Sequence, residues 1–344
     1  MLEALMPPAG YVAASVILFF IGFIGFFANL TVIVLMCRDQ QLWTPLNCIL
    51  FNLIMSDFSV SILGNPFTLA SAIAHRWLFG HTMCIMYGFF MALLGITSIS
   101  TLTALAIERY LIISRPLNRR ALSRRSAVTV VAGVWVYSLT LTVPPLMGWG
   151  EYGPEAANIS CSVNWEERTT LSTSYIIFLF IFGFFVPLFV ICYSYINIIF
   201  TMKENVVVKG SVTKAESRVA GMIFVMIFAF FIAWTPYAVL TLLIAFANED
   251  ISPAVATIPA IFAKTSICYN PIIYVGLNTQ FRKSWRSLFG WNTCSDVSAE
   301  VADMSAASYR KTCFTNANSL EQSQFKSTKI TLLGVKPFQT ETAI

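Results

Sequence analysis

The chain has 344 residues, of which 57% are hydrophobic and only 11% are charged. This balance excludes an ordinary soluble globular protein, in which about a quarter of the residues are charged. The formal net charge of +5 is no reason to expect a nucleic acid as a partner, because it comes from basic residues in the loops and the tail that surround long apolar segments.

Apolar stretches long enough to cross a bilayer, which takes about 20 residues in a helix, recur along the chain. Only helices or closed barrels satisfy their backbone polar groups inside lipid, so these stretches predict transmembrane helices. The sequence therefore predicts an all-α membrane protein, a seven-transmembrane helix bundle, with helices at 11–36, 46–71, 84–110, 127–148, 174–200, 217–246 and 254–276.

The segment Thr279–Phe289 is basic and amphipathic, which predicts a short eighth helix on the membrane face. Residues 1–290 would then form the bundle with this helix. Residues 291–344 mix serine, threonine, alanine and charges without apolar periodicity, which predicts a disordered tail. Cys294 lies just after the amphipathic segment and is a candidate for palmitoylation; an unmodified thiol is the alternative.

Lysine and arginine are concentrated in the loops that follow helices one, three, five and seven. Because such loops face the cytoplasm, we expect the N-terminus outside and the C-terminus inside a plasma membrane or photoreceptor membrane. The basic residues are Arg38, Arg115, Arg119, Arg120, Arg124, Arg125, Lys203, Lys209, Lys214, Arg282, Lys283 and Arg286.

Two cysteines, Cys84 and Cys161, fall on the predicted outer side, at the start of helix three and in the second outer loop. That compartment is oxidising, so we expect a disulfide between them. It would hold the loop across the mouth of the bundle.

Lys264 is the only lysine inside a predicted span. An ammonium near the bilayer midplane costs several kcal/mol, so such a residue is a functional candidate. Three arrangements would make it tolerable: a nearby carboxylate, a neutral amine, or covalent capture of the amine as a Schiff base.

Two groups of charged residues lie at or within the spans. Glu108-Arg109-Tyr110 ends helix three, and Glu216 at the start of helix six is a candidate partner for Arg109. A pair between two helices would act as a switch, closed or open. The alternative is that Arg109 only follows the positive-inside rule. Asp57 is the only carboxylate deep within a span, and we expect Asn29 and Asn270 to meet it.

Two predicted helices contain an internal proline, Pro236 in helix six and Pro271 in helix seven. Proline removes a backbone hydrogen bond and bends a helix, which gives each helix a pivot. An ordinary bundle would explain either one alone.

Taken together and in this order, these features resemble the rhodopsin-like G-protein-coupled receptors. They are Asn29, Asp57, Glu108-Arg109-Tyr110, Trp135, Pro187, Trp234-x-Pro236 and Asn270-Pro271-x-x-Tyr274. Lys264, six residues before Asn270 and within Phe-Ala-Lys-Thr-Ser, narrows the resemblance to animal opsins. The short third inner loop and Asn278-Thr-Gln280 resemble the ciliary class, with invertebrate ciliary and encephalopsin-like opsins the most similar.

The resemblance implies that Lys264 binds 11-cis-retinal as a protonated Schiff base, which needs a negative partner. The span-three position that is glutamate in vertebrate visual opsins is Tyr87 here, and a neutral tyrosine cannot balance a charge. Glu155, six residues before Cys161, matches the loop glutamate that serves as counterion in non-bleaching opsins. We therefore expect Glu155 as counterion, Tyr87 in its network, and a bistable pigment. A solvated loop acid is the alternative for Glu155.

The resemblance also implies the remaining site residues and the partners. The pocket walls would be Gly88, Met91, Ala92, Gly95, Trp234, Tyr237 and Ala260, and Tyr195 would join the activation switch. The expected partners are a heterotrimeric G protein of the Gi/Go/transducin class, and arrestin and a receptor kinase at the tail. Thr342–Ile344 has the form of a PDZ-domain ligand.

Two other functions use the same residues. A retinal photoisomerase would also use Lys264, whereas a receptor for a diffusible ligand would use it only as a salt-bridge residue. The intact Glu108-Arg109-Tyr110 motif favours coupling over the first, and the lack of a carboxylate deep within spans three and seven disfavours the second. A light-driven pump would need carboxylates along a transmembrane path, and the chain offers almost none.

Overall fold

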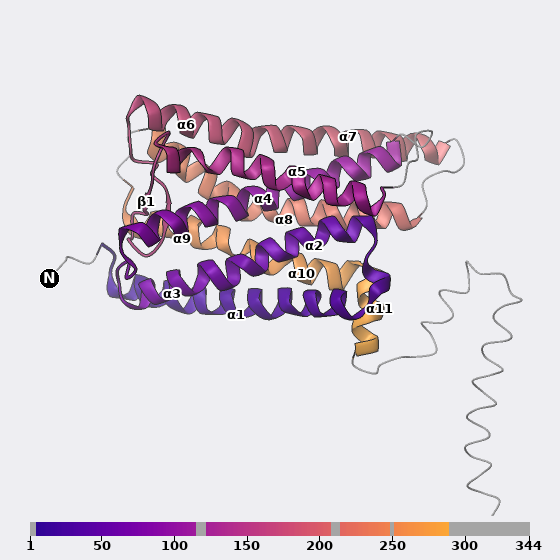
Figure 1. Ribbon diagram of the computed structural model, residues 1–344, viewed down its shortest axis with the longest axis horizontal. Helices are drawn as coiled ribbons and strands as arrows, with labels where there is room; N and C mark the ends of the chain where they lie inside the picture. The colour runs from indigo at the N-terminus through magenta and orange to yellow at the C-terminus, as the bar shows by residue number, and fades with distance from the viewer. Residues whose placement is uncertain (1–4, 115–121, 208–213, 248–250, 289–344) are drawn as a thin grey trace, which may run out of the picture. The chain divides into compact units, whose positions relative to one another are not determined.

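The computed structural model describes residues 5–114, 122–207, 214–247 and 251–288. One compact unit spans Met1–Trp285, and in it long helices run side by side (Figure 1). The described helices form seven rods: α1 (Pro8–Arg38), α2–η2–α3 (Pro45–Ser59, Val60–Gly64, Asn65–Ile73), α4 (Gly80–Ser114), α5 (Arg124–Thr142), α6–η5–α7 (Thr170–Phe180, Ile181–Phe185, Val186–Val207), α8 (Lys214–Phe246) and α9–α10 (Pro253–Lys264, Ser266–Leu277).

The seven predicted spans all correspond to these rods, but one predicted boundary is wrong. The fourth span was expected to reach residue 148, and α5 ends at Thr142. Pro144 and Pro145 follow, and they form the short helix η4 (Pro144–Met147) instead. Proline cannot donate the backbone hydrogen bond that would continue α5, so the helix ends before the pair.

Three of the rods are interrupted where the sequence predicted continuous helices. The wider turns η2 and η5 lie just before Pro66 and Pro187. The third interruption follows Lys264 directly: Thr265 separates α9 from α10, and its N–H bonds to the carbonyl of Phe262, three residues back. These local departures from the α-helical ladder bend the rods around the interior of the bundle.

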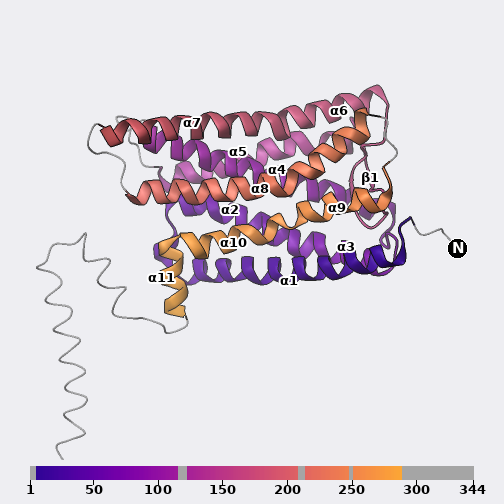
Figure 2. The ribbon, with the colours of Figure 1, turned by 180° about the vertical axis from the view of Figure 1, so that it is seen from behind.

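A short antiparallel hairpin, β1 (Tyr152–Pro154) and β2 (Cys161–Val163), lies at one end of the bundle. Its register pairs Tyr152 with Val163 and Pro154 with Cys161. The start of α1 lies at the same end, as both ribbon views show (Figures 1 and 2). The predicted eighth helix is α11 (Thr279–Leu288), which follows α10 at the opposite end.

Five of the described helical rods are individually long and apolar enough to cross a membrane. The other two rods are less apolar or shorter. The helix α5 begins with two arginines, which lower its mean hydropathy, and α9 and α10 have only 12 residues each. Large apolar side chains are exposed on the outside of the bundle, for example those of Phe19, Val136, Phe189 and Phe228. Such a surface is expected where lipid replaces water as the surroundings.

Candidate functional site

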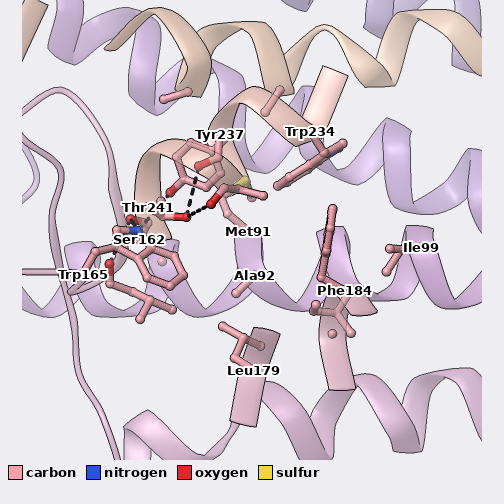
Figure 3. Close-up of a pocket in the computed structure, with 18 of the residues that line it drawn as sticks. Met91, Ala92, Ile99, Ser162, Trp165, Leu179, Phe184, Trp234, Tyr237 and Thr241 are labelled. Carbon is pink, nitrogen blue, oxygen red and sulfur yellow. Dashed lines mark hydrogen bonds between the residues drawn. The ribbon is translucent and has the colours of Figure 1, made fainter. Parts of the chain in front are cut away.

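A cavity lies between α4, η5, α8, α9 and the hairpin (Figure 3). Among the described residues that line it, Lys264 is the only basic one and Glu155 the only acidic one. The rest of the wall is mainly apolar and aromatic. An amine and a carboxylate therefore share an enclosure that otherwise offers little to solvate a charge.

All seven predicted pocket walls, Gly88, Met91, Ala92, Gly95, Trp234, Tyr237 and Ala260, line this cavity. Two of them are glycines that pack closely against aromatic rings. A Cβ on Gly88 would lie 3.0 Å from the Tyr152 ring, and one on Gly95 would lie 3.1 Å from the Trp234 ring. The missing side chains at these two positions therefore let the two rings approach α4 closely.

Sequence reasoning missed the wall on the side of α6 and η5. This wall consists of Leu179, Phe180, Gly183 and Phe184, and Trp165 and Phe230 add aromatic rings beside it. No simple pattern distinguishes these residues, because the lipid-facing and cavity-facing sides of this rod are equally apolar. The break at η5 sets which side chains point inward, and the expected continuous helix did not include it.

Glu155 follows β1, and two hydroxyl groups hold its carboxylate. The Tyr237 hydroxyl donates to Glu155 Oε1 over 2.9 Å, and the Ser160 hydroxyl donates to Oε2. The indole N–H of Trp165 lies 3.2 Å from both the Tyr237 hydroxyl and the Ser162 hydroxyl. A chain of donors therefore leads from the hairpin through α8 to the carboxylate, which stabilises its charged form.

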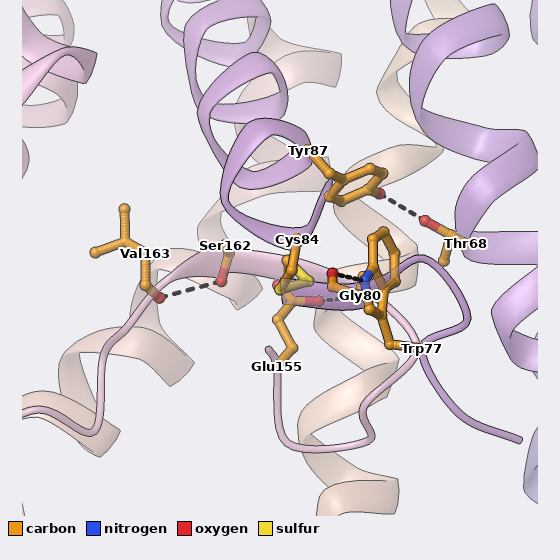
Figure 4. Close-up of a disulfide and its surroundings, with 10 residues drawn as sticks. Thr68, Trp77, Gly80, Cys84, Tyr87, Glu155, Ser162 and Val163 are labelled. Atoms are coloured by element: carbon orange, nitrogen blue, oxygen red, sulfur yellow. Dashed lines mark hydrogen bonds between the residues drawn. A yellow bond between two sulfur atoms is a disulfide. The ribbon is translucent and has the colours of Figure 1, made fainter. Parts of the chain in front are cut away.

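Tyr87 is close to Lys264 but is not part of the cavity wall. It is buried, and its hydroxyl shares a 2.5 Å hydrogen bond with the Thr68 hydroxyl (Figure 4). Tyr87 and Glu155 are the two side chains that act electrostatically on the Lys264 amine. Within the described residues, however, no carboxylate lies within 4.0 Å of that amine as an ion pair.

The hairpin is fixed in place by covalent and polar contacts. The predicted disulfide between Cys84 and Cys161 is present and ties β2 to α4 beside Glu155 (Figure 4). The Tyr152 hydroxyl donates to the Thr142 carbonyl over 2.7 Å, which joins β1 to α5. Burial raises the pKa of this phenol, so it stays protonated and keeps donating.

Of the two asparagines expected to meet Asp57, only Asn270 does so. Its side-chain amide donates to Asp57 Oδ2 over 2.8 Å. The Asn29 amide donates instead to the carbonyls of Gly25 and Ile267. Ile267 lies four residues before Pro271, and its carbonyl would normally accept from the N–H that proline lacks. Asn29 therefore donates to the carbonyl that Pro271 leaves without its usual partner. The expectation that Asn29 contacts Asp57 is corrected accordingly.

The Arg109 guanidinium forms two hydrogen bonds of 2.5 Å with the carboxylate of its chain neighbour Glu108, and both residues are buried. Glu216 lies in the first turn of α8, and its pairing with Arg109 stays a prediction. Tyr110 packs against Tyr193 of α7, with ring centroids 5.7 Å apart. These residues gather at the end of the bundle away from the hairpin.

Three further switch residues connect neighbouring helices. The Tyr195 hydroxyl of α7 donates to the Ala220 carbonyl of α8 over 3.1 Å. Tyr274 of α10 is fully buried and stacks on Phe281 of α11. The Trp234 indole N–H, two residues before Pro236, donates over 3.1 Å to the hydroxyl of Ser266. A movement near Lys264 therefore has a direct polar route into α8. Cys294 and Thr342–Ile344 lie outside the described residues.

Comparison with known proteins agrees with this arrangement. The family model of the 7 transmembrane receptor (rhodopsin family) matches residues 28–274. Pinopsin of Columba livia is 38% identical over 281 residues, which cover 80% of each chain. Parapinopsin of Ictalurus punctatus is 35% identical, with 81% of this chain and 82% of the relative covered. The crystal structure of squid rhodopsin superimposes with a TM-score of 0.78 at 32% identity, covering 83% of this chain and 87% of that one.

The chain is an animal opsin. It belongs to the rhodopsin family of G-protein-coupled receptors, which are multi-pass membrane proteins that couple to a heterotrimeric G protein and are receptors rather than enzymes. The predicted family and the predicted seven-helix fold are both confirmed. Melanopsin of Phodopus sungorus is 37% identical to this chain, nearly as much as pinopsin. The match covers 61% of the melanopsin. The ciliary subclass therefore stays a prediction.

Proposed function

We propose that this opsin is a light receptor that holds retinal, 11-cis in the dark, through a Schiff-base bond to the Lys264 amine. When bound, retinal supplies a polyene that absorbs visible light and changes shape on absorption. The observation that carries the proposal is one amine in a cavity whose wall is otherwise mainly apolar. Gly88 and Gly95 line the same cavity and leave no side chain between α4 and the rings of Tyr152 and Trp234.

Glu155 is the proposed counterion. It shares the cavity with Lys264, acts on its amine electrostatically, and is held by Tyr237 and Ser160. A carboxylate that accepts charge-assisted hydrogen bonds keeps its negative charge, which then balances a positive charge at the lysine. Tyr87 contributes a dipole without a charge, and its bond to Thr68 fixes its direction.

The site of the counterion also supports a bistable pigment. Glu155 lies on a hairpin fixed by the disulfide to α4 and by Tyr152 to α5, so it does not depend on the position of Lys264. A counterion fixed in this way can continue to balance the charge after light has moved the groups around Lys264. We therefore expect a photoproduct that keeps its chromophore and returns on a second photon.

The signal would leave the cavity through Trp234 and Pro236 of α8. Displacing Trp234 breaks its bond to Ser266, and α8 can swing about Pro236 because the proline leaves the helix without one backbone hydrogen bond. The residues around Arg109 would then separate and admit a G protein, which we propose is of the Gi/Go/transducin class. We also propose the outward N-terminus and the tail-binding partners: arrestin, a receptor kinase and a PDZ protein.

The attachment is tested by replacing Lys264 with alanine. The purified wild-type opsin should form a visible absorbance band with 11-cis-retinal, and Lys264→Ala should form none. Lys203→Ala, which removes an exposed lysine of α7, is the matched control and should keep the band. A Lys264→Ala opsin that forms the wild-type band, and traps retinal covalently after acid denaturation, would refute the proposal.

Coupling is tested separately from chromophore binding. Light should accelerate nucleotide exchange on a G protein of the proposed class when the reconstituted opsin is present, and darkness should not. A pigment that isomerises retinal without exchange on any G-protein class would favour a photoisomerase.

A further inference from the structure

A second chamber lies beside the retinal cavity, on the side of the hairpin. The two share a wall that includes Lys264, Glu155, Trp165 and Tyr237. Beyond that wall the second chamber extends between the hairpin, the end of α8 and the start of α9. We call it the outer chamber. Lys264 therefore borders two spaces, one on either side of the Trp165–Tyr237–Glu155 hydrogen-bond chain.

The outer chamber differs chemically from the cavity it adjoins. Its own lining adds polar side chains from three parts of the chain: Thr68, Ser160, Asn164, Glu166 and Thr257. These side chains, among otherwise apolar neighbours, are groups to which water can hydrogen-bond, and a wholly apolar cavity lacks such groups. The space also reaches the protein surface, because Pro154 and Glu166 of its lining are exposed.

We propose that the outer chamber is an aqueous vestibule through which water and small hydrophilic solutes reach the Lys264 amine from the hairpin side. The hairpin then covers the retinal cavity without sealing its lysine from solvent. For the free amine this inference depends only on the two chambers. For the retinal-bound protein it rests on the proposed function as well.

The shared wall sets what passes between the two spaces. Trp165 and Tyr237 place their rings edge to face, with centroids 6.4 Å apart, and Tyr237 bonds to Glu155. Water in the vestibule therefore meets the lysine and the carboxylate directly, while these rings separate it from the apolar cavity. Solvent exchange at Lys264 should depend on residues of the vestibule that do not touch the retinal cavity.

Reductive alkylation of the retinal-free opsin tests the vestibule without any chromophore. Glycolaldehyde condenses with a lysine amine and releases water, and cyanoborohydride then donates hydride to the C=N bond to leave a stable hydroxyethyl group. The opsin is treated in lipid nanodiscs, and peptide mass spectrometry follows Lys264 over time. The exposed Lys203 serves as an internal measure of reagent activity.

Two substitutions narrow the vestibule from opposite walls. Ala256 of α9 and Ala156 of the hairpin both line the outer chamber and are absent from the retinal cavity. Ala256→Leu and Ala156→Phe should each slow modification of Lys264 several-fold while Lys203 reacts at the wild-type rate. The matched control is Val255→Leu, on the neighbouring residue of α9, which points outward with 55% of its surface exposed. It should not change the rate.

Folding of each variant is checked by thermal unfolding, and two different walls are used so that one misfolded variant does not decide the result. The vestibule is refuted if Lys264 stays unmodified while Lys203 reacts fully. It is also refuted if both narrowing variants react at the rate of Val255→Leu, because the reagent would then reach the amine by another route.

Hydroxylamine extends the test to the reconstituted pigment in the dark. It should remove the visible band from the wild type faster than from Ala256→Leu. A protein that forms no pigment yet shows vestibule-dependent alkylation would refute the proposed function and keep the vestibule. A pigment that resists hydroxylamine, from an opsin whose free amine resists glycolaldehyde, would refute the vestibule and keep the function.

Discussion

The hairpin end of the bundle and the region around Asp57 both bury polar side chains, but they bond them differently. At the hairpin end, the hydroxyls of Tyr152 and Tyr237 and the carboxylate of Glu155 all have partners. Elsewhere in the described bundle, including the surroundings of Asp57, several buried polar atoms have no partner among the described residues. They are Asn29 Oδ1, Ser56 Oγ, Asn65 Oδ1, Ser71 Oγ, Thr97 Oγ1, Ser100 Oγ and the Tyr274 hydroxyl.

This difference separates a fixed part from a part that can change. A fully bonded polar network favours one arrangement, because any movement breaks hydrogen bonds. A buried polar group without a protein partner in one arrangement can gain one in another. The proposed chromophore site therefore lies beside the fixed part, and the Asp57 region has more to gain from a rearrangement.

The largest effect is expected from Glu155→Gln at the fixed end. The amide keeps the size of the side chain and removes its charge, so nothing balances the proton at the Lys264 linkage. The absorbance maximum should move from the visible to the near ultraviolet at neutral pH. Glu151→Gln, an exposed acid of the same loop, is the control and should leave the spectrum unchanged. If Tyr87→Phe produced the shift and Glu155→Gln did not, the counterion would be wrongly assigned.

Removing the disulfide should cost stability at the same end. The bond closes a separation of 77 residues, and the loss of such a link typically costs about 2–5 kcal/mol. The Cys84→Ala/Cys161→Ala double variant should unfold at a clearly lower temperature and lose pigment faster. The control is Cys192→Ala, which removes an exposed free thiol of α7. Equal unfolding temperatures for the two variants would mean that the hydrogen bonds alone fix the hairpin.

Asp57→Asn should separate stability from signalling in the other region. The substitution keeps a polar group for Asn270 and removes a buried carboxylate, so the unfolding temperature should stay equal or rise. Light-dependent nucleotide exchange should fall, because the rearrangement loses its charged centre. A fall in both stability and pigment yield would place Asp57 in the fixed part instead.

The smallest effect is expected from Tyr274→Phe. Its hydroxyl is buried with no partner among the residues that the structure describes, so its removal should change stability by no more than about 1 kcal/mol, and upward if at all. Activation should slow, because the hydroxyl is then missing from the second arrangement. Tyr152→Phe is the comparison, since it removes a bonded hydroxyl and should destabilise the opsin. Equal losses of stability would remove the distinction between the two regions.

The positions of the helices could be predicted from the sequence because lipid imposes a length and an apolar composition on each of them. The disulfide followed from the side of the membrane on which Cys84 and Cys161 lie. The pocket walls on α4, α8 and α9 followed from family resemblance, and all seven residues line the cavity.

The interruptions of the helices could not be predicted in the same way. A hydropathy pattern does not report whether a carbonyl accepts from the third, fourth or fifth following residue, so η2, η5 and the break at Thr265 were missed. The partner of Asn29 was missed for a related reason. Proximity in the bundle predicted that Asn29 contacts Asp57. Pro271 has no N–H to donate to the Ile267 carbonyl, however, and the Asn29 amide donates to that carbonyl instead.

The break after Lys264 also has a mechanical consequence. A continuous helix transmits torque along its length, but the single residue Thr265 interrupts the ladder between the segment that carries the lysine and the segment that carries Asn270 and Pro271. The segment α9 can twist or tilt when a few backbone angles change at Thr265, while α10 keeps its helical hydrogen bonds. The seventh rod thus acts as two levers of 12 residues each with a common hinge, and Lys264 is the last residue of the first lever, directly before the hinge.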